Sequence, residues 1–187
     1  MAQKPTFKIV QAESPLLRAV AQDVPIKSIS TPRIKKILKE MAAAIASRDD
    51  AVAIAAPQLG YPLRMFMVSG KIFEAEEDEV GVEQTYGARN FIFINPTLTR
   101  ISKRKEAMEE GCLSVDAQYG MVRRAQKATV RAYDEHGNPF EWGGSGLLSQ
   151  IFQHEVDHLN GILFIDTAKN LRKVSAKEAI SLRHESR

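Results

Sequence analysis

The sequence predicts an α+β fold in which short strands, in mixed or antiparallel sheets, pack around a central helix that carries an H-E-x-x-H motif. Two helical segments come first, a series of short apolar runs between turn residues fills the middle, and a further helical segment follows. Strands that are not separated by helices favour such sheets over a doubly wound parallel sheet. We expect the whole chain, 1–187, to form one domain.

Two Ser/Thr-Pro pairs mark the first helical segments. Ser14 and Pro15 fit an N-cap and a first turn, and predict a short helix to about Ala21. Thr31 and Pro32 repeat the signal before a longer helix. The apolar residues that follow recur at helical spacing and should form its buried face: Ile34, Ile37, Leu38, Met41 and Ile45.

Short apolar runs predict the strands. They lie at 52–56, 63–68, 91–95 and 128–133, and a turn at 134–138 predicts a hairpin into a further strand at 139–142. Between them, the acidic stretch 70–90 indicates a solvated surface insertion, with a partner-binding loop as the alternative.

The last elements are helical. Ser145 fits an N-cap, and Gly161 is a stop signal. Between them, apolar residues recur at helical spacing: Leu147, Leu148, Ile151 and Phe152. The H-E-x-x-H motif at 154–158 therefore lies on a helix. Ser175 and Glu178 fit a capping box that opens a short C-terminal helix.

Composition excludes several classes of function. The chain contains one cysteine, so an internal disulfide is impossible; this suits the cytoplasm and leaves the thiol free for a metal or for catalysis. No apolar stretch is long enough to span a membrane, and no secretory signal is apparent. With a net charge of only +3 and no recognisable nucleic-acid-binding motif, we expect no DNA partner.

One cysteine and two histidines suggest a metal site. His154 and His158 lie four residues apart, hence on one face of a helix, with Glu155 rotated beside them. Cys112 is the natural third ligand, which leaves a coordination position open for hydrolytic chemistry. The alternatives are two hydrogen-bonded histidines on a helix and a cysteine buried as a small apolar residue.

Three motifs resemble the signatures of the peptide deformylases. The second and third are E-G-C-L-S at 110–114 and Q-H-E-V-D-H-L-N-G at 153–161. The first, G-x-G-x-A-A-x-Q, is similar to A-V-A-I-A-A-P-Q at 51–58, where Ala51 and Ala53 replace the glycines. The motifs occur in the family's order, and the resemblance extends over nearly the whole chain.

The resemblance implies hydrolysis of the N-formyl group from formylmethionyl nascent peptides at the ribosome, with release of formate. It implies one divalent metal ion, iron(II) in the cell with zinc, nickel or cobalt possible. Its ligands would be Cys112, His154 and His158. Glu155 would move the proton, and the Gln58 side chain and the Leu113 backbone N–H would donate to the oxyanion. Gln58 could alternatively cap a strand.

The resemblance also suggests how the substrate is bound. The backbone at Val52 and Ala53 would pair with the peptide, and Leu147 and Gln150 would lie in the methionine pocket. Three further residues would support the metal ligands: Glu110, Gly111 and Arg124, the last as the partner of Glu110.

Several residues depart from the family pattern. If the two glycine positions need positive φ or a close approach of the substrate, alanine would be strained or would block the substrate. If φ is ordinary there, alanine is tolerated. Gln150 is polar where the family has an apolar residue, and Tyr119 stands where many members carry arginine.

Two other functions remain open. A metallopeptidase is favoured by H-E-x-x-H, although a cysteine ligand within E-G-C-L-S argues against it. A non-catalytic peptide-binding relative is suggested by the two alanines. The basic C-terminus indicates a solvated tail helix, with contact to ribosomal RNA as the alternative.

Overall fold

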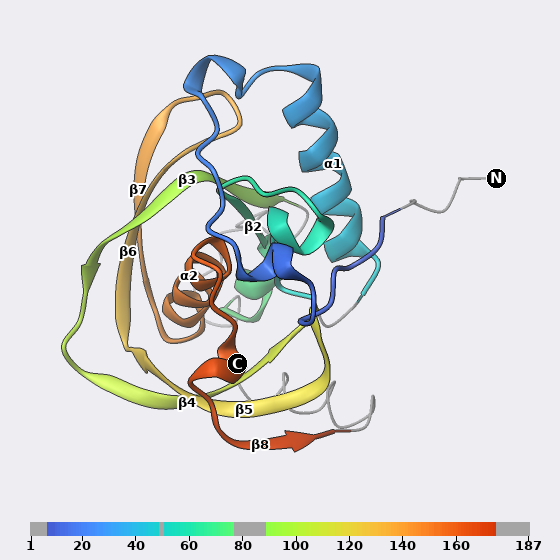
Figure 1. Cartoon of the computed structure of the whole chain (residues 1–187). Helices are drawn as coiled ribbons and strands as arrows, with labels where there is room; N and C mark the ends of the chain where they lie inside the picture. The colour runs from blue at the N-terminus through green and yellow to red at the C-terminus, as the bar shows by residue number, and fades with distance from the viewer. Residues whose placement is uncertain (1–6, 49–50, 77–88, 175–187) are drawn as a thin grey trace.

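Two antiparallel sheets form the framework of the molecule. The computed structural model describes residues 7–48, 51–76 and 89–174 (Figure 1). The larger sheet has the order β1-β2-β3-β6-β7, and the smaller the order β4-β5-β8. All pairings within both sheets are antiparallel, so the predicted fold class is confirmed. The bounds of the strands are β1 Ala53–Ala55, β2 Met65–Ser69, β3 Asn90–Ile101, β4 Lys105–Cys112, β5 Val115–Ala125, β6 Lys127–Tyr133, β7 Pro139–Ser145 and β8 Lys169–Lys173.

Helix α1, Pro32–Ala46, buries the face that its periodicity predicts. Ile34, Ile37, Leu38, Met41 and Ile45 are all buried, together with Ala44. The Thr31 side chain does not cap the helix, because its hydroxyl donates to the Ser28 carbonyl instead. These side chains form one hydrophobic cluster with β1 and β2.

The predicted helix at 15–21 is shorter than expected. A single 3-10 turn spans Pro15–Arg18, and the Ser14 hydroxyl accepts from Leu16 N as an N-cap. The chain is then extended, because the Ala21 N–H donates to the Leu159 carbonyl at 2.9 Å. This bond satisfies one of the carbonyl groups that a helix leaves free at its C-terminus.

Helix α2, Gly146–Leu159, lies between the two sheets and has a different character on each side (Figure 1). Toward the larger sheet it buries Ile151, Phe152, Val156 and Leu159 in a second cluster. Toward β5 it presents Ser149 and Gln153, two buried polar side chains. Because α2 contacts both sheets, it fixes the site that lies between them.

The smaller sheet was not predicted. Strand β8 is exposed at every residue, and β4 is exposed over its first three. Neither gives the alternating apolar pattern by which a half-buried strand is recognised. Strand β3 also runs six residues past the predicted end, to Ile101. Most of the residues in this extension are exposed.

The start of the acidic stretch 70–90 packs against the larger sheet. It begins with the 3-10 helix Gly70–Glu76, and the Phe73 ring stacks on Trp142 at 5.7 Å. The prediction of a solvated segment was therefore wrong for its start. Residues 77–88 lie outside the described residues, as does the predicted C-terminal helix that the capping box at 175–178 would open. Of the basic C-terminus, Arg172 and Lys173 are described, and they lie in strand β8 and not in a tail helix.

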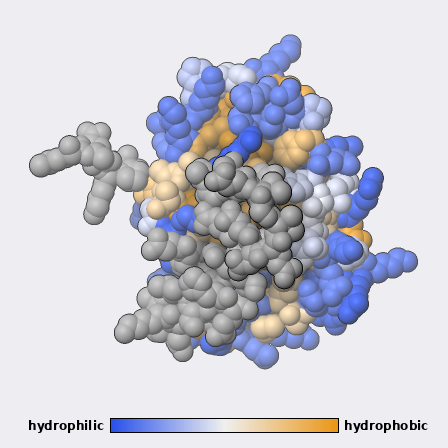
Figure 2. All heavy atoms as spheres, turned by 180° about the vertical axis from the view of Figure 1, so that it is seen from behind, coloured by the Kyte–Doolittle hydropathy of each residue, from blue (hydrophilic) through white to orange (hydrophobic). Residues whose placement is uncertain are grey.

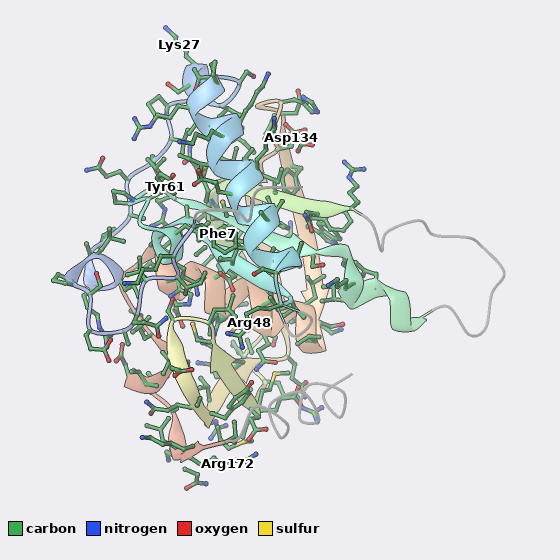
Figure 3. All side chains as sticks on the ribbon, turned by 90° about the vertical axis from the view of Figure 1, so that its right-hand side faces the viewer. Phe7, Lys27, Arg48, Tyr61, Asp134 and Arg172 are labelled. Atoms are coloured by element: carbon green, nitrogen blue, oxygen red, sulfur yellow. The ribbon has the colours of Figure 1, made fainter. Side chains whose placement is uncertain are left out.

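The surface is mainly hydrophilic on the side seen in Figure 2, where apolar atoms show only in smaller areas. Lys27 and Arg172 lie at opposite ends of the molecule (Figure 3). Within the described ranges, none of the helices combines the length and apolarity that crossing a bilayer requires.

Candidate metal centre

The structure brings the three predicted metal ligands together. The ligand atoms of Cys112, His154 and His158 all lie within 4.8 Å of one another, and Cys112 Sγ is 3.2 Å from His158 Nε2. The histidines project from adjacent turns of α2, and the cysteine ends β4. The pairing of β4 with β5 is irregular between Gly111 and Cys112. Cys112 therefore leaves the regular ladder at the point where it meets α2.

A carboxylate orients the first histidine. Glu110 Oε2 lies 2.9 Å from His154 Nδ1, and both carboxylate oxygens also accept from Arg124, at 2.6 and 3.0 Å. Burial alone would raise the pKa of Glu110, but hydrogen bonds from His154 and Arg124 outweigh it and lower the pKa to about 2. Because an ionised carboxylate only accepts, the proton lies on His154 Nδ1, and Nε2 is left to bind a metal.

Arg124, which binds Glu110, also binds a residue of α2. Its Nη1 donates to Asp157 Oδ2 at 2.6 Å. Asp157 thus points away from the ligand cluster and toward β5, as helix geometry predicts. The buried guanidinium thus links Glu110, the partner of His154, to Asp157 on α2. Although burial opposes its charge, hydrogen bonds and attraction from Glu110 raise the pKa of Arg124 above its usual value.

The environment of Cys112 favours a thiolate. Its sulfur accepts from Gln58 Nε2 and from the Ser114 backbone N–H, each at 3.4 Å. Burial opposes ionisation, but the charge of His158 and hydrogen bonds from His154 and His158 lower the pKa of Cys112 to about 5. A thiolate is the form of cysteine that binds metals.

The three ligand groups and an unpartnered carboxylate oxygen make the donor set fit a divalent ion. Among the described residues, Glu155 Oε2 and His158 Nδ1 are the buried side-chain atoms without a hydrogen-bond partner. Burial raises the pKa of Glu155 to about 7, despite the opposing charges of His154 and His158. A thiolate, two imidazoles and a free carboxylate oxygen beside them are the groups of a hydrolytic metal centre.

The Gln58 side chain makes a capping contact and also reaches the cysteine of the site. Its Oε1 accepts from Ala55 N at 2.8 Å and so caps the 3-10 turn Ala56–Leu59. Its Nε2 donates to Cys112 Sγ and, at 3.2 Å, to Ser114 Oγ. The capping contact therefore fixes the amide group with its N–H donors directed at the site.

Comparison with known proteins decides the family. The model of the polypeptide deformylase family matches residues 6–174. The chain belongs to the peptide deformylase family. Removal of the formyl group from nascent peptides, the reaction of these hydrolases, is therefore its reaction.

Individual peptide deformylases are similar over most of the chain. The one from Desulforudis audaxviator is 35% identical, covering 89% of this chain and 96% of that protein. The chloroplastic peptide deformylase 1A of Solanum lycopersicum is 34% identical over 84% of this chain, which spans 58% of that protein's length. A Met-Ala-Ser-bound structure from Acinetobacter baumannii has a TM-score of 0.75 and 27% identity, covering 88% of this chain and 99% of that one. An actinonin complex from Synechococcus elongatus has a TM-score of 0.72 and 26% identity, covering 99% and 88%.

The alanines that replace the deformylase glycines are not strained. The non-glycine residues with positive φ in the described part of the chain are Asn95, Ala117 and Asn170, so neither Ala51 nor Ala53 is among them. The second of the two alternatives from the sequence therefore holds. An alanine is accommodated there without the cost that positive φ would impose.

Val52 and Ala53, the two residues expected to pair with a peptide, differ in the direction of their backbone groups. The Val52 carbonyl accepts from Ser69 N at 2.8 Å and is thus turned toward β2. Since backbone groups alternate along a strand, those of Ala53 face the open edge of the sheet. The Val52 carbonyl is therefore occupied by the protein itself.

The two residues expected in the methionine pocket lie in different surroundings. Leu147 packs against the cluster shared by α2 and the larger sheet. Gln150 is buried on the side of β4, where its Nε2 donates to the Glu109 carbonyl at 2.8 Å. The polar side chain that departs from the deformylase pattern thus ties α2 to the strand that carries Glu110 and Cys112.

Tyr119 explains why residue 111 must be small. A Cβ at Gly111 would lie 2.6 Å from Tyr119 Cε1, well inside van der Waals contact. The buried Tyr119 ring therefore covers the glycine that precedes the cysteine ligand.

Sequence reasoning missed the residues that hold α2 against β5. Gln153 Oε1 accepts from Ala125 N, and its Nε2 donates to Ala125 O, at 2.9 and 3.0 Å. Ser149 Oγ donates to the same carbonyl at 2.8 Å. Both partners are backbone groups more than twenty residues away, so no spacing in the sequence indicates them.

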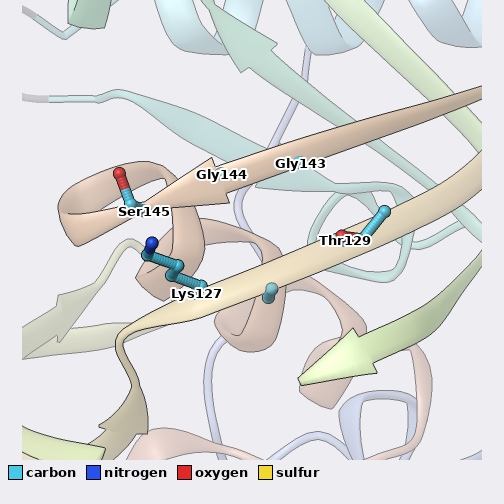
Figure 4. Close-up of a pocket in the computed structure, with 6 residues that line it drawn as sticks. Lys127, Thr129, Gly143, Gly144 and Ser145 are labelled. Carbon is cyan, nitrogen blue, oxygen red and sulfur yellow. The ribbon is translucent and has the colours of Figure 1, made fainter. Parts of the chain in front are cut away.

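A hollow between β6 and β7 is separate from the metal centre (Figure 4). Lys127, Ala128, Thr129, Gly143, Gly144 and Ser145 line it. None of the predicted site residues is among them.

Proposed function

We propose that this chain hydrolyses N-formylmethionyl peptides at one divalent metal ion held by Cys112, His154 and His158. The observation that carries the proposal is the convergence of these three ligand atoms beside the unpartnered, buried Oε2 of Glu155. When bound, the ion supplies a Lewis acid that makes water nucleophilic near neutral pH. One thiolate and two imidazoles suit iron(II), zinc, nickel or cobalt, and we propose iron(II) in the cell.

Glu155 is the group proposed to move the proton. It follows His154 directly on α2, and its Oε2 is free of protein hydrogen bonds within the described ranges. A carboxylate so placed can accept a proton from the attacking water and pass it to the leaving amine.

Gln58 and Leu113 are proposed to bind the oxyanion. Gln58 Nε2 is held beside Cys112 by the bond between its Oε1 and Ala55 N. The Leu113 N–H follows the cysteine in the chain, so the two donors approach the site from different elements. Donors fixed before the reaction stabilise developing charge without reorganisation.

The open edge of β1 is proposed to receive the peptide. The backbone groups of Ala53 can pair with an extended substrate as an added strand. We place the methionine side chain between Val52, Leu147 and Gln150, with Glu110, Gly111 and Arg124 supporting the ligands behind it. The Acinetobacter baumannii neighbour that binds Met-Ala-Ser supports a peptide as the ligand.

The remaining proposals concern the cellular setting. Helix α2 contacts strands of both sheets, which supports a single domain over the described chain. The family reaction supports nascent chains at the ribosome as the source of substrate and the cytoplasm as the compartment. The free thiol of Cys112 suits that compartment.

Formate release tests the proposed function. Anaerobically purified protein, loaded with iron(II), should release formate from formyl-Met-Ala and should leave unformylated Met-Ala-Ser intact. Cleavage of the unformylated peptide would indicate a metallopeptidase. Binding of formyl-Met-Ala without formate release would indicate a non-catalytic relative.

The Gln58→Glu variant separates the acceptor role of Gln58 Oε1 from the donor role of Gln58 Nε2. A carboxylate can still accept from Ala55 N, but it has no N–H to donate to the oxyanion. We expect kcat to fall by about a hundredfold, the usual effect of losing one oxyanion donor, with the protein still folded. Steady-state kinetics and denaturant unfolding measure the two effects. An unchanged kcat would show that Gln58 is only a cap.

A further inference from the structure

The segment at residues 7–12, called here the N-terminal strap, lies in the seam between two hydrophobic clusters. Phe7 and Ile9 pack against the cluster that contains α1, which Leu113 also contacts. Val10 and Ala12, together with Cys112, pack against a third hydrophobic cluster. Its buried residues are Leu17, Val115, Val122, Leu163 and Phe164. Figure 3 shows Phe7 close to α1. Contacts with both clusters hold the strap beside the metal centre.

Two hydrogen-bonding groups of the strap reach the backbone of the site. The Val10 N–H donates to the Gln58 carbonyl at 2.8 Å. The exposed side chain of Gln11 donates through Nε2 to the Leu113 carbonyl and to the Ile9 carbonyl, each at 3.4 Å. The strap therefore contacts both residues proposed to bind the oxyanion, although it belongs to neither of their elements.

The contact at Leu113 leads directly to the cysteine sulfur. The Leu113 carbonyl and the Ser114 N–H belong to the same planar peptide unit. That N–H donates to Cys112 Sγ at 3.4 Å. A donor on the carbonyl fixes the plane, and hence the direction of the N–H, and polarises the amide so that it donates more strongly.

We propose that Gln11 is a positioning residue of the metal centre. By donating to the Leu113 carbonyl, it orients the peptide unit whose N–H contacts the sulfur of Cys112, and it steadies the turn that carries the Leu113 N–H. Gln11 touches neither the substrate nor the metal in this account. The expected effect of Gln11 on kcat rests on the proposed function, whereas its expected effect on the Cys112 sulfur is independent of turnover.

The test uses the full chain loaded with Co²⁺, whose sulfur-to-metal charge-transfer absorption reports on the cysteine. Gln11→Met keeps the length of the side chain and removes its donor. Gln126→Met is the matched control, because the amide of Gln126 also donates through Nε2, in its case to Glu106 Oε2 at 2.9 Å, away from the site.

We expect Gln11→Met to shift the charge-transfer band and to lower kcat for formyl-Met-Ala about fivefold, the effect of one neutral hydrogen bond, with KM unchanged. Gln126→Met should match the wild type in both measurements. Because Gln11 is exposed, the variant should fold; Gln11→Glu, which has the same reach and no donor, should reproduce the effect.

Three results would overturn the proposal. The first is a charge-transfer band and a kcat that both equal those of the wild type in both Gln11 variants. The second is a raised KM at unchanged kcat, which would make Gln11 a substrate contact. The third is a wild-type protein that shows no sulfur-to-cobalt band. A band that shifts in the variants of a protein that releases no formate would support the role of Gln11 and refute the proposed function instead.

Discussion

Glu155→Gln should lower kcat for formyl-Met-Ala by about a thousandfold while leaving the metal content unchanged. General acid–base catalysis contributes rate factors of this order, and the amide cannot accept the proton. Metal should be retained because Glu155 is not among the three clustered ligands. Metal analysis and kinetics on the same preparation measure both quantities.

Folding is not at risk in this variant. Burial raises the pKa of Glu155, which means that the charged form is costly in the folded protein. A neutral glutamine of the same shape should therefore unfold at the same or a higher denaturant concentration. Glu40→Gln, which affects contacts with Tyr61 and with the exposed Lys36, is the control. A metal-loaded Glu155→Gln protein with more than a tenth of the wild-type kcat would contradict the role of Glu155.

Arg124→Met should lower the free energy of unfolding by about 3–5 kcal/mol, the cost of leaving a buried ion pair without one partner. Arg124 is the guanidinium that compensates buried Glu110 and half-buried Asp157. The metal affinity should also fall, by about 10–100-fold, because Glu110 orients His154. The neighbouring exposed residue offers a matched control, since Arg123→Met should change the stability by less than about 0.5 kcal/mol.

The same contact predicts how the stability of the metal-free protein depends on pH. The pKa of Glu110 is about 2 in the folded protein and 4.5 without its partners. A lowered pKa means that this stabilisation is present above about pH 4.5 and is lost as the pH falls toward 2. The acid-side slope of unfolding free energy should be shallower in Arg124→Met. Equal slopes in the two proteins would contradict the assignment of the ion pair.

The sequence could reveal groups whose partners are close in the chain. His154 and His158 share a helix face, so their spacing alone predicts that they converge. Cys112 and Gln58 come from other elements. Cys112 was inferred from its residue type as the third ligand that H-E-x-x-H needs, whereas only the family resemblance joined Gln58 to the histidines. The contact between Glu110 and Arg124 likewise came from alignment with the family, and it is present in the structure.

Other features had no signal that a single sequence could show. The smaller sheet exposes the first three residues of β4 and all of β8, so those strands lack an apolar period. Gln153 and Gln11 act on backbone carbonyls and N–H groups, which every residue possesses. Their partners, Ala125 and Leu113, are therefore unmarked by residue type. The orientation of Val52 was expected to be free, but Ser69 takes its carbonyl.

Metal titration tests the central claim most directly. Metal-free protein would be titrated anaerobically with iron(II) while formate release from formyl-Met-Ala is followed, with Cys112→Ser treated in parallel. We expect activity to rise in proportion to bound metal and to stop rising at one ion per chain, and we expect Cys112→Ser to bind the ion much more weakly. Activity without bound metal, or a fully loaded wild-type protein that releases no formate, would contradict a catalytic metal centre at Cys112, His154 and His158.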